Sequence, residues 1–472
     1  MTFSRSFFSL AVAAAGVIGS GTLRAEELSR FDYGFNFKLT AQSIDDLDLG
    51  TRDEGDFNGL GLSVRPWIFG ARGDWSGFVR GEAFAGTDVL ESSQVEGDNL
   101  ESNDGRERDD SFLALHEFWV DYAGLTAYPG ESLRFGRQRI RTPDGMWWDT
   151  NIEALRWNFD TTLFNAHLAV AERFSDYRTD LDDLAPQDED RQHYFGDIST
   201  QWRPGHWAGL KLHHSRDNGD LPKPGERVDE LSKTYTGDLT WVGAEFNGDF
   251  FNPRSTMPLN YWAAATYMQG DAELLQTSSA TGERRAVGGR DQDVSGWAVD
   301  LGLRWNIDEQ WRLGGTYTRA SGGGDAEDSD QFLQTDLQSN RSRFTGTRSS
   351  LHRFGEAYRG EMNNLQAASL FGSWTMDKRY DASVVYHRFW RVDDDLDSAS
   401  GLSVGLEPGE KDLGEEVDLV LTRYFDRSEL GWAEAESALV RLRGGVFLPG
   451  DAFPSGTDSS MHRVFLDLVW RY

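Results

Sequence analysis

The segment WAVDLGLRWNI, residues 297–307, alternates between apolar and polar or small side chains. Its apolar positions are Trp297, Val299, Leu301, Leu303, Trp305 and Ile307, and the positions between them are Ala298, Asp300, Gly302, Arg304 and Asn306. Successive side chains of a β-strand point to opposite faces, so this segment would have one apolar face and one polar, charged face. The pattern predicts a strand with one side in an apolar environment and the other side in water.

The same alternation recurs along the chain in segments of about ten residues, and no helical period persists. We therefore expect about eighteen antiparallel strands. Their expected residues are 31–41, 59–70, 73–86, 111–122, 131–141, 151–160, 162–173, 192–203, 206–216, 236–247, 258–270, 293–306, 309–320, 364–376, 378–391, 414–425, 437–448 and 461–472. The segment 111–122 alternates poorly, because Glu117 and Asp121 share a face with Trp119.

The connecting segments distinguish a membrane barrel from a water-soluble sandwich with the same strand pattern. GDW (73–75), DTT (160–162), RPGHW (203–207) and NIDEQ (306–310) are tight turns. Between them lie long acidic stretches at 87–110, 176–191, 271–291, 320–349 and 392–414. Short periplasmic turns, long extracellular loops and aromatic residues near strand ends are typical of outer-membrane β-barrels. We expect an all-β transmembrane barrel whose lumen is open at this strand number.

The last segment, MHRVFLDLVWRY (461–472), fits a strand that closes such a barrel. The face expected to contact lipid carries Val464, Leu466, Leu468, Trp470 and Tyr472. Arg463, Asp467 and Arg471 fall on the other face, because every fourth residue is two strand repeats. These three charges are expected to point into the pore.

Composition and the N-terminus fit a protein exported from the cytoplasm. Residues 1–25 have Arg5, an uncharged core from Phe7 to Ile18 and a small residue at Ala25, as a secretory signal peptide does. Residues 26–472 show no internal repeat or linker and are expected to form one outer-membrane barrel domain. A mean hydropathy of −0.56 excludes a polytopic helical membrane protein. A net charge of −31 argues against nucleic-acid binding, and the chain has no cysteine for disulfides.

No motif in the sequence argues for catalysis. GLSVG (401–405) matches the G-x-S-x-G pattern of a nucleophile elbow, but it lies in a loop instead of between a strand and a helix. The chain has 9 His and no Cys, and they do not cluster as metal ligands do. Acidic runs such as DNLESNDGRERDD (98–110) and APQDEDR (185–191) fit solvated loops better than cation sites. We expect a non-enzyme that works without a metal or cofactor.

Basic side chains on the polar face of the expected strands give the sharpest functional signal. They are Lys38, Arg65, Arg304, Arg441, Arg443 and Arg463. One interpretation is ordinary solvation of the lumen, with ion pairs to Asp32, Asp300 and Asp467. The other interpretation is an anion-selective pore, because rings of Arg and Lys select anions and apolar walls focus their field. The acidic surplus would then lie in the loops, outside the conduction path.

Long stretches of the sequence resemble the bacterial alginate export porins of the outer membrane. The likeness is carried by HEFWVDYAGLTAYPGE (116–131), FGRQR (135–139), DTNIEALRWNFDTTL (149–163), ERFSDYRTDLDDLAP (172–186), SKTYTGDLTW (232–241), VDLGLRWNIDEQW (299–311), QSNRSRFTGTRS (338–349), HRFGEAYRGE (352–361) and FWRVDDD (389–395). The likeness covers nearly the whole mature chain and is highly specific.

The resemblance implies a monomeric barrel through which secreted alginate, a polymer of mannuronate and guluronate, crosses the outer membrane. In that family a basic constriction selects the polyanion, and its positions fall here on Lys38, Arg65, Arg139, Arg341 and Arg441. The acidic partners of these arginines fall on Asp149, Asp176, Asp180 and Asp467. The alternation supports Lys38, Arg65, Arg441 and Asp467 independently. The alternation does not decide the orientation of Arg139, and it gives no prediction for Arg341, which lies in a loop.

Two arginines of the family pattern are replaced in this chain, by His116 and Ser350. Histidine is only partly charged near neutral pH, so the constriction would be weaker unless Arg343 and Arg348 compensate. The family also gates its pore with a long outer loop, here 87–110, and plugs it from below with a periplasmic turn. That turn, FDRSELGWAEAES (425–437), is shorter here.

We therefore hypothesise an anion-selective outer-membrane porin that exports alginate passively. Its expected partners are alginate, outer-membrane lipid, and the periplasmic synthesis and secretion proteins that deliver the polymer. Two alternatives stay open. One is a general anion-selective porin, and the other is a barrel-borne enzyme that modifies alginate.

Overall fold

The computed structural model describes residues 29–45, 49–50, 57–87, 109–181, 183–226, 228, 232–278, 285–324, 328–377, 379–394, 402, 404–427, 429 and 437–472. The expected signal peptide, residues 88–108 of the expected gating loop, and most of the turn 427–436 lie outside the described residues, as do Gly401 and Ser403. No helix in these described ranges is long and apolar enough to cross a membrane.

The described chain forms a closed barrel of 18 antiparallel strands, which confirms the expected fold. The barrel strands are β1 (Ser29–Ile44), β2 (Phe57–Arg72), β3 (Trp75–Gly86), β4 (Ser111–Tyr122), β5 (Glu131–Arg141), β6 (Asp149–Asp160), β7 (Phe164–Glu172), β8 (Arg191–Arg203), β9 (His206–Asp217), β10 (Tyr235–Gly248), β11 (Leu259–Ser278), β12 (Arg285–Asn306), β13 (Trp311–Ala320), β17 (Leu365–Met376), β18 (Tyr380–Arg391), β19 (Asp412–Asp426), β20 (Ser437–Pro449) and β21 (Met461–Arg471). Three short strands, β14 (Asp328–Ser329), β15 (Arg341–Ser342) and β16 (Leu351–His352), and the 3₁₀ turn η1 (Pro186–Asp188) lie in loops.

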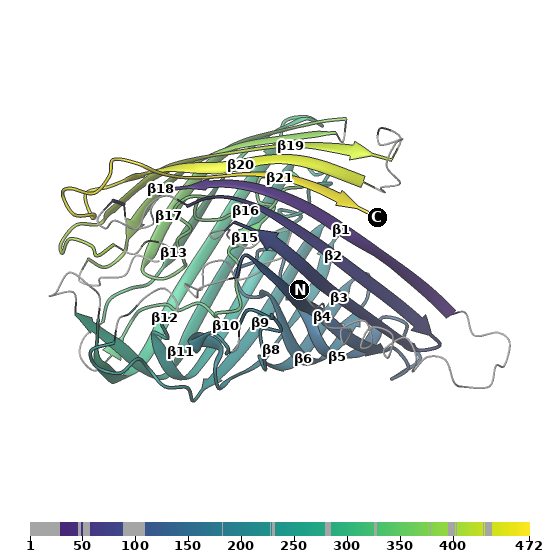
Figure 1. The fold of residues 1–472 in the computed structure, drawn as a ribbon, viewed down its shortest axis with the longest axis horizontal. Coiled ribbons are helices and arrows are strands. Elements are labelled where there is room, and N and C mark those ends of the chain that lie inside the picture. The colour runs from purple at the N-terminus through teal and green to yellow at the C-terminus, as the bar shows by residue number, and fades with distance from the viewer. Residues whose placement is uncertain are drawn as a thin grey trace.

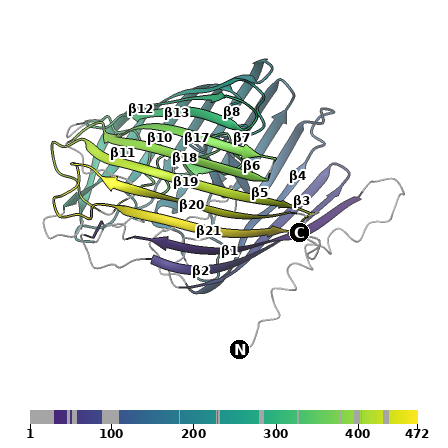
Figure 2. The same cartoon turned by 90° about the horizontal axis from the view of Figure 1, so that it is seen from above.

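The last strand pairs with the first, which closes the barrel. β21 pairs antiparallel with β1 from Asn36↔Arg471 to Ile44↔Arg463, and the two lie side by side in Figures 1 and 2. Each of the other neighbouring pairs joins two barrel strands that follow one another in the chain. Both chain ends of the barrel therefore lie at the short-turn end, which is the periplasmic end of such barrels.

The outer surface of the barrel carries the apolar face of each strand, as the alternation predicts. In β12, Trp297, Leu301 and Leu303 are 44%, 45% and 52% exposed, while Asp300 and Arg304 are buried on the inner face. In β21, Leu466 is exposed, while the next residue, Asp467, is buried on the inner face. The apolar face of each strand therefore contacts lipid and the charged face points into the lumen.

A β-bulge explains why the segment 111–122 alternates poorly. The pairing of β3 with β4 shifts between Arg80 and Gly81, so that Arg80 lies opposite Glu117, Gly81 lies opposite Leu115, and His116 is the extra residue. A bulge changes which face the following residues occupy. Both His116 and Glu117 are buried inside as a result.

The outer half of the β5–β6 hairpin bends away from the barrel wall into the lumen. β4 pairs with β5 only from Phe118 to Tyr122, and all of Asp149–Ala154 in β6 is buried on both faces. The loop after β7 takes its place in the wall, because the amide N–H of Leu115 donates to the carbonyl oxygen of Tyr177. This inward bend is the reason that alternation alone was equivocal for Arg139.

Two of the long loops differ from the expectation. The expected loop 271–291 is largely an extension of β11 and β12, which pair as far as Ser278 and Arg285. The expected outer loop 320–349 belongs to a longer connection, 321–364, that folds into the barrel, where β15 and β16 are seen between the walls in Figure 1. Its residues 340–342 and 344–358 are almost all buried. The expectation that the long loops lie outside the lumen is therefore wrong for this segment, which we call the inward loop.

Glycines on the lumen face make room for the segments that fold inward. A Cβ on Gly296 of β12 would lie 2.6 Å from Cα of Phe332 in the inward loop. A Cβ on Gly302 would lie 2.5 Å from the ring of Phe250, in the periplasmic turn after β10. Gly243 of β10 similarly faces the ring of Trp147. A larger side chain at these positions would occupy the place of the inward segment.

Candidate functional site

Asp467 is shared by basic side chains from both neighbouring strands. It lies opposite Arg441 of β20 and opposite Thr40 of β1 in the strand register. Its carboxylate is 3.0 Å from Nη2 of Arg441, 3.2 Å from Nζ of Lys38 and 3.6 Å from Nε of Arg443, and it accepts a hydrogen bond of 3.0 Å from Thr40 Oγ1. All four charged groups are buried in the lumen wall. Three basic side chains therefore surround one carboxylate.

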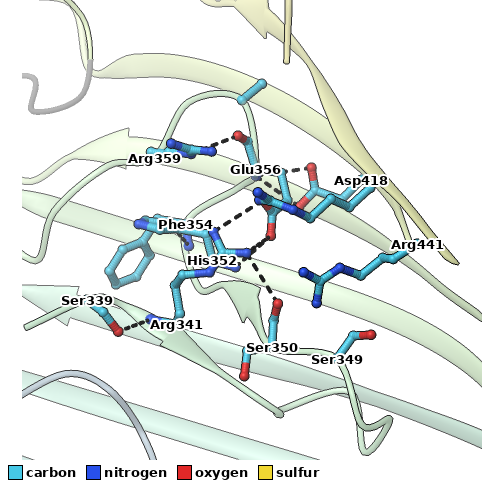
Figure 3. A network of polar contacts seen from close by, with 12 residues as sticks. Ser339, Arg341, Ser349, Ser350, His352, Phe354, Glu356, Arg359, Asp418 and Arg441 are labelled. Carbon is cyan, nitrogen blue, oxygen red and sulfur yellow. Dashed lines mark hydrogen bonds and ion pairs between the residues drawn. The ribbon is translucent and has the colours of Figure 1, made fainter. Parts of the chain in front are cut away.

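Glu356 lies beside Arg341 in the inward loop (Figure 3) and connects that loop to this group through Arg443. Its carboxylate accepts hydrogen bonds from Arg341 Nη2 at 2.8 Å and from Arg443 Nη1 at 2.9 Å. The backbone N–H of His352 donates to the same carboxylate at 3.0 Å. Arg341 also donates to the carbonyl oxygen of Ser350 at 3.2 Å. The loop thus brings Arg341 to the side chains of β20, although Arg341 is not part of a barrel strand.

Charge and burial set the protonation states of these loop residues. Burial alone would raise the pKa of Glu356, but Arg341 and Arg443 outweigh it and hold that pKa well below its ordinary value. Burial and the adjacent Arg341 and Arg359 hold the pKa of His352 well below its ordinary value. Burial lowers the pKa of Arg341 to about 10. Near neutral pH, Glu356 and Arg341 are therefore charged and His352 is neutral.

Two carboxylates of β19 hold the turn that contains Glu356. Glu416 accepts hydrogen bonds from the backbone N–H groups of Ala357 at 2.7 Å and Tyr358 at 2.9 Å. Asp418 accepts one from the N–H of Glu356 at 3.2 Å and contacts His387 Nε2 at 3.1 Å. Consecutive N–H groups that point to one side form an anion-binding concavity. Here that concavity fixes the inward loop to the wall.

Glu82 of β3 forms a second centre with two of the predicted basic residues. Its carboxylate is 3.1 Å from Nε of Arg65 and 2.7 Å from Nε2 of His116, and Ser63 Oγ also donates to it. The side chains of Arg65, Glu82 and His116 are almost completely buried. The bulge in β4 is what turns His116 towards Glu82.

Asp149 is the third centre and lies at the tip of the inward hairpin. It is 2.5 Å from Nη2 of Arg139 and 3.6 Å from Nε of Arg141. Ser339 Oγ of the inward loop donates to the same carboxylate at 2.8 Å. Arg141 Nη2 lies 3.4 Å from Ser350 Oγ, the position where the family pattern has an arginine. The hairpin and the inward loop are thus joined beside Arg139 and Arg341.

The structure puts the other predicted residues in different surroundings. Asp180 forms an ion pair with Arg178 at 2.6 Å, and Asp176 lies 4.0 Å from Arg173, all within the loop after β7. Arg348 pairs with Asp381, the second residue of β18.

Arg304 and Arg463 also face inward, but Arg304 is hydrogen-bonded to the backbone of the turn after β10. Its guanidinium donates to the carbonyl oxygen of Asn252 at 3.1 Å and to that of Phe250. Arg463 is buried on the lumen face of β21. Facing the lumen is therefore not sufficient to assign a basic residue to the conduction path.

Sequence reasoning missed the two glutamates that join these groups. Glu82 falls on the polar face of β3, with Val79 and Ala83 on the other face, so alternation contains a signal for it. Glu356 has no such signal, because it lies in a loop between β16 and β17. Only the path of the inward loop through the barrel brings it between Arg341 and Arg443.

The closed barrel, its lipid-facing apolar surface and its short periplasmic turns define an outer-membrane β-barrel of the porin class. Solved porin-class structures share the fold. Vanillate-bound OpdK of Pseudomonas aeruginosa has a TM-score of 0.52 at 12% identity, with 93% of this chain and 98% of that chain covered. OccAB2 of Acinetobacter baumannii has a TM-score of 0.53 at 11% identity, with the same coverage. At this identity the likeness shows the fold alone.

A family model described as alginate export matches residues 29–467, and the chain belongs to that family. A relative in Pseudomonas aeruginosa, the alginate production protein AlgE, is 58% identical over 451 residues, which cover 93% of this chain and 92% of the relative. The proteins of the same name in Pseudomonas syringae and Azotobacter vinelandii are 48% and 46% identical, and each alignment covers 93% of this chain. It covers 94% of the first relative and 93% of the second.

Proposed function

We propose that this barrel exports alginate from the periplasm through an anion-selective passage lined by its lumenal basic residues. The proposed lining consists of Lys38, Arg65, His116, Arg139, Arg341, Arg441 and Arg443. The observation that carries the proposal is that each of two lumenal carboxylates, Asp467 and Glu356, is shared by more than one basic side chain. Asp467 lies beside three basic side chains and Glu356 beside two, with Arg443 common to both, so four basic side chains surround these two carboxylates.

These basic side chains would act on ions in the lumen through their electric field. Low-dielectric walls focus the field of fixed charges, and basic residues around a pore favour anions over cations. Alginate is a polyanion with one carboxylate per sugar. The acidic surplus of the whole chain, with its net charge of −31, does not oppose this, because it is spread over the rest of the molecule.

The passage would run along one side of the lumen. The inward loop contacts β12 through Arg353 and Asp300, at 2.5 Å, and β19 through Asp418. The proposed lining comes from β20, β1, β2, β4 and the β5–β6 hairpin, together with the face of the loop that carries Arg341. We infer that the loop narrows the barrel and leaves the basic wall as the path.

The same proposal includes partners and oligomeric state. Every barrel strand has a paired neighbour on each side within the chain, and the barrel closes on itself through β1 and β21. This favours a monomer, because no strand edge needs a second copy. A passive barrel supplies no energy, so we infer that periplasmic synthesis and secretion proteins deliver the polymer and set its direction.

Recordings from purified protein in planar bilayers test the proposal. We expect an anion-selective reversal potential in a salt gradient, and concentration-dependent block by mannuronate oligomers. Arg441→Glu would reduce the anion selectivity, and Asp32→Asn, a change in an exposed periplasmic residue, is the control. Selectivity for anions without block by mannuronate oligomers would identify a general anion porin instead. Shortening or deacetylation of polymannuronate by the purified protein would identify an enzyme.

A further inference from the structure

A row of aromatic rings crosses three neighbouring strands near the periplasmic end of the lumen. Trp67 of β2 and Phe78 of β3 are stacked, with ring centroids 6.2 Å apart and an angle of 27° between the rings. Phe78 and Trp119 of β4 are stacked in the same way, at 5.6 Å and 26°. The guanidinium of Arg134 in β5 lies 3.8 Å from the centroid of Trp119. We call Trp67, Phe78 and Trp119 the aromatic row.

The aromatic row faces the lumen and not the lipid. Each of its members is flanked along its strand by a residue of the opposite face that contacts lipid: Ile68, Val79 and Val120 are 39%, 37% and 42% exposed. Trp67 shares its face with Arg65, and Phe78 shares its face with Glu82, both buried inside. The rings of the row are half-buried, so part of their surface is open. Aromatic residues near strand ends are usually membrane girdles, and this row is an exception.

The aromatic row lies directly on the periplasmic side of the Glu82 centre. Trp67 follows Arg65 by two residues along β2, which is about 7 Å towards the periplasm. Trp119 follows His116 by three residues along β4 towards the same end, with the bulge between them. A polymer that enters from the periplasm along this wall therefore passes the row before it reaches Arg65 and His116.

Charged and polar side chains border the rings. Arg80 pairs with Glu117, and Arg134 pairs with Asp121 at 3.0 Å. Arg156 lies opposite Arg134 in the strand register. The row is thus an apolar platform with guanidinium groups along its edge.

We propose that the aromatic row binds pyranose rings of a polyuronate as the polymer enters the lumen. The proposal rests on the function proposed above and specifies where the sugar rings are held. One face of a pyranose ring presents C–H groups that pack against an aromatic ring, and each uronate also has one carboxylate. A ring platform with Arg134 at its edge matches both features of that unit. A polyanion without sugar rings would match only the second feature.

The test compares two ligands of the same charge and length, a mannuronate oligomer and an oligoaspartate, added to the periplasmic side of single barrels in a planar bilayer. In the double variant Trp67→Leu/Trp119→Leu we expect the preference for the mannuronate oligomer over the oligoaspartate to fall about tenfold. The variant Trp119→Phe keeps a ring and should retain most of the preference. Trp75→Leu is the control, because Trp75 is 56% exposed at the same end of β3.

The outcomes separate the two proposals. An unchanged preference in the double variant, or an equal fall in Trp75→Leu, would overturn the role of the aromatic row while the export function stands. Absence of any block of the unmodified barrel by mannuronate oligomers would overturn the export function, and the role of the row with it. Heat-modifiable migration on gels shows whether each variant forms a barrel, and the single variant Trp67→Leu provides the same comparison if the double variant does not fold.

Discussion

Asp467 of β21 and Arg441 of β20 lie directly opposite each other and form a buried ion pair, with Arg441 Nη2 3.0 Å from Asp467 Oδ2. The exposed fractions of the two side chains are 0% and 4%. Lys38 reaches the same carboxylate from the strand on the other side. One buried carboxylate is therefore shared by three basic side chains, Lys38, Arg441 and Arg443.

Asp467→Asn should increase the anion selectivity and lower the stability of the barrel. The change removes the carboxylate that Lys38 and Arg441 share, and the loss of one partner of a buried ion pair costs about 3 kcal/mol or more. The measurements are the reversal potential in a salt gradient and the temperature at which the barrel unfolds on gels. Asp32→Asn removes the same charge from a half-exposed side chain and is the control. Equal selectivity in the two variants would contradict the role of Asp467.

Glu356→Gln should release Arg341 and Arg443 from their common partner and loosen the inward loop. Both arginines donate to the Glu356 carboxylate, at 2.8 Å and 2.9 Å. We expect stronger anion selectivity, noisier single-channel current and faster tryptic cleavage after Arg341 or Arg359. A variant as resistant to trypsin as the unmodified protein, with the same reversal potential, would show that Glu356 does not position these arginines.

The effect of Glu356 should persist to acid pH. Its pKa is held well below its ordinary value, so its contribution is complete above the ordinary value of about 4.3. The contribution is lost only as the pH falls through the lower pKa of the folded state. The difference in reversal potential between the unmodified protein and Glu356→Gln should therefore be constant from pH 8 to about 5. A difference that disappears between pH 7 and 5 would mean that the pKa of Glu356 is raised above its ordinary value instead of lowered.

Gly296→Val should displace the inward loop and enlarge the conducting path. A Cβ at this position would lie 2.6 Å from Cα of Phe332, so the backbone of the loop has to move. We expect a larger single-channel conductance from a barrel that still forms. Gly372→Ala is the control, because its Cβ would meet only Leu313, at 3.5 Å. Equal conductance in both variants would show that the position of the inward loop does not depend on the glycine at position 296.

His116→Arg should increase anion selectivity near neutral pH, because an arginine side chain is effectively always protonated. Glu82 is already within 2.7 Å of this side chain and can pair with the new guanidinium.

Ser350→Arg should instead destabilise the inward loop, since Ser350 is buried beside Arg141 and Arg341. The measurements are the reversal potential for the first variant and trypsin resistance for the second. Reduced selectivity in His116→Arg would contradict the prediction.

The barrel itself could be predicted from the sequence because strand alternation is a local property. Residues such as Leu301 and Asp300 are assigned to opposite faces by their positions alone, and lipid on one side makes the pattern strict. The same rule correctly placed Lys38, Arg65, Arg441 and Asp467 on the lumen face. The rule failed at His116, because the β-bulge there changes which residues of β4 face the lumen. It also failed at Arg139, because the outer half of the β5–β6 hairpin bends out of the barrel wall.

The tertiary structure alone decided which of the charged residues meet. Glu356 and Arg341 lie in a loop with no periodic pattern, and their contact with Arg443 depends on the path of that loop through the lumen. The aromatic row likewise depends on register, since Trp67, Phe78 and Trp119 are distant in sequence and become neighbours only when β2, β3 and β4 pair. Local sequence thus determined the strands and their faces, because alternation needs only neighbouring residues. Long-range pairing determined the site, because contacts between distant segments are not encoded in any one of them.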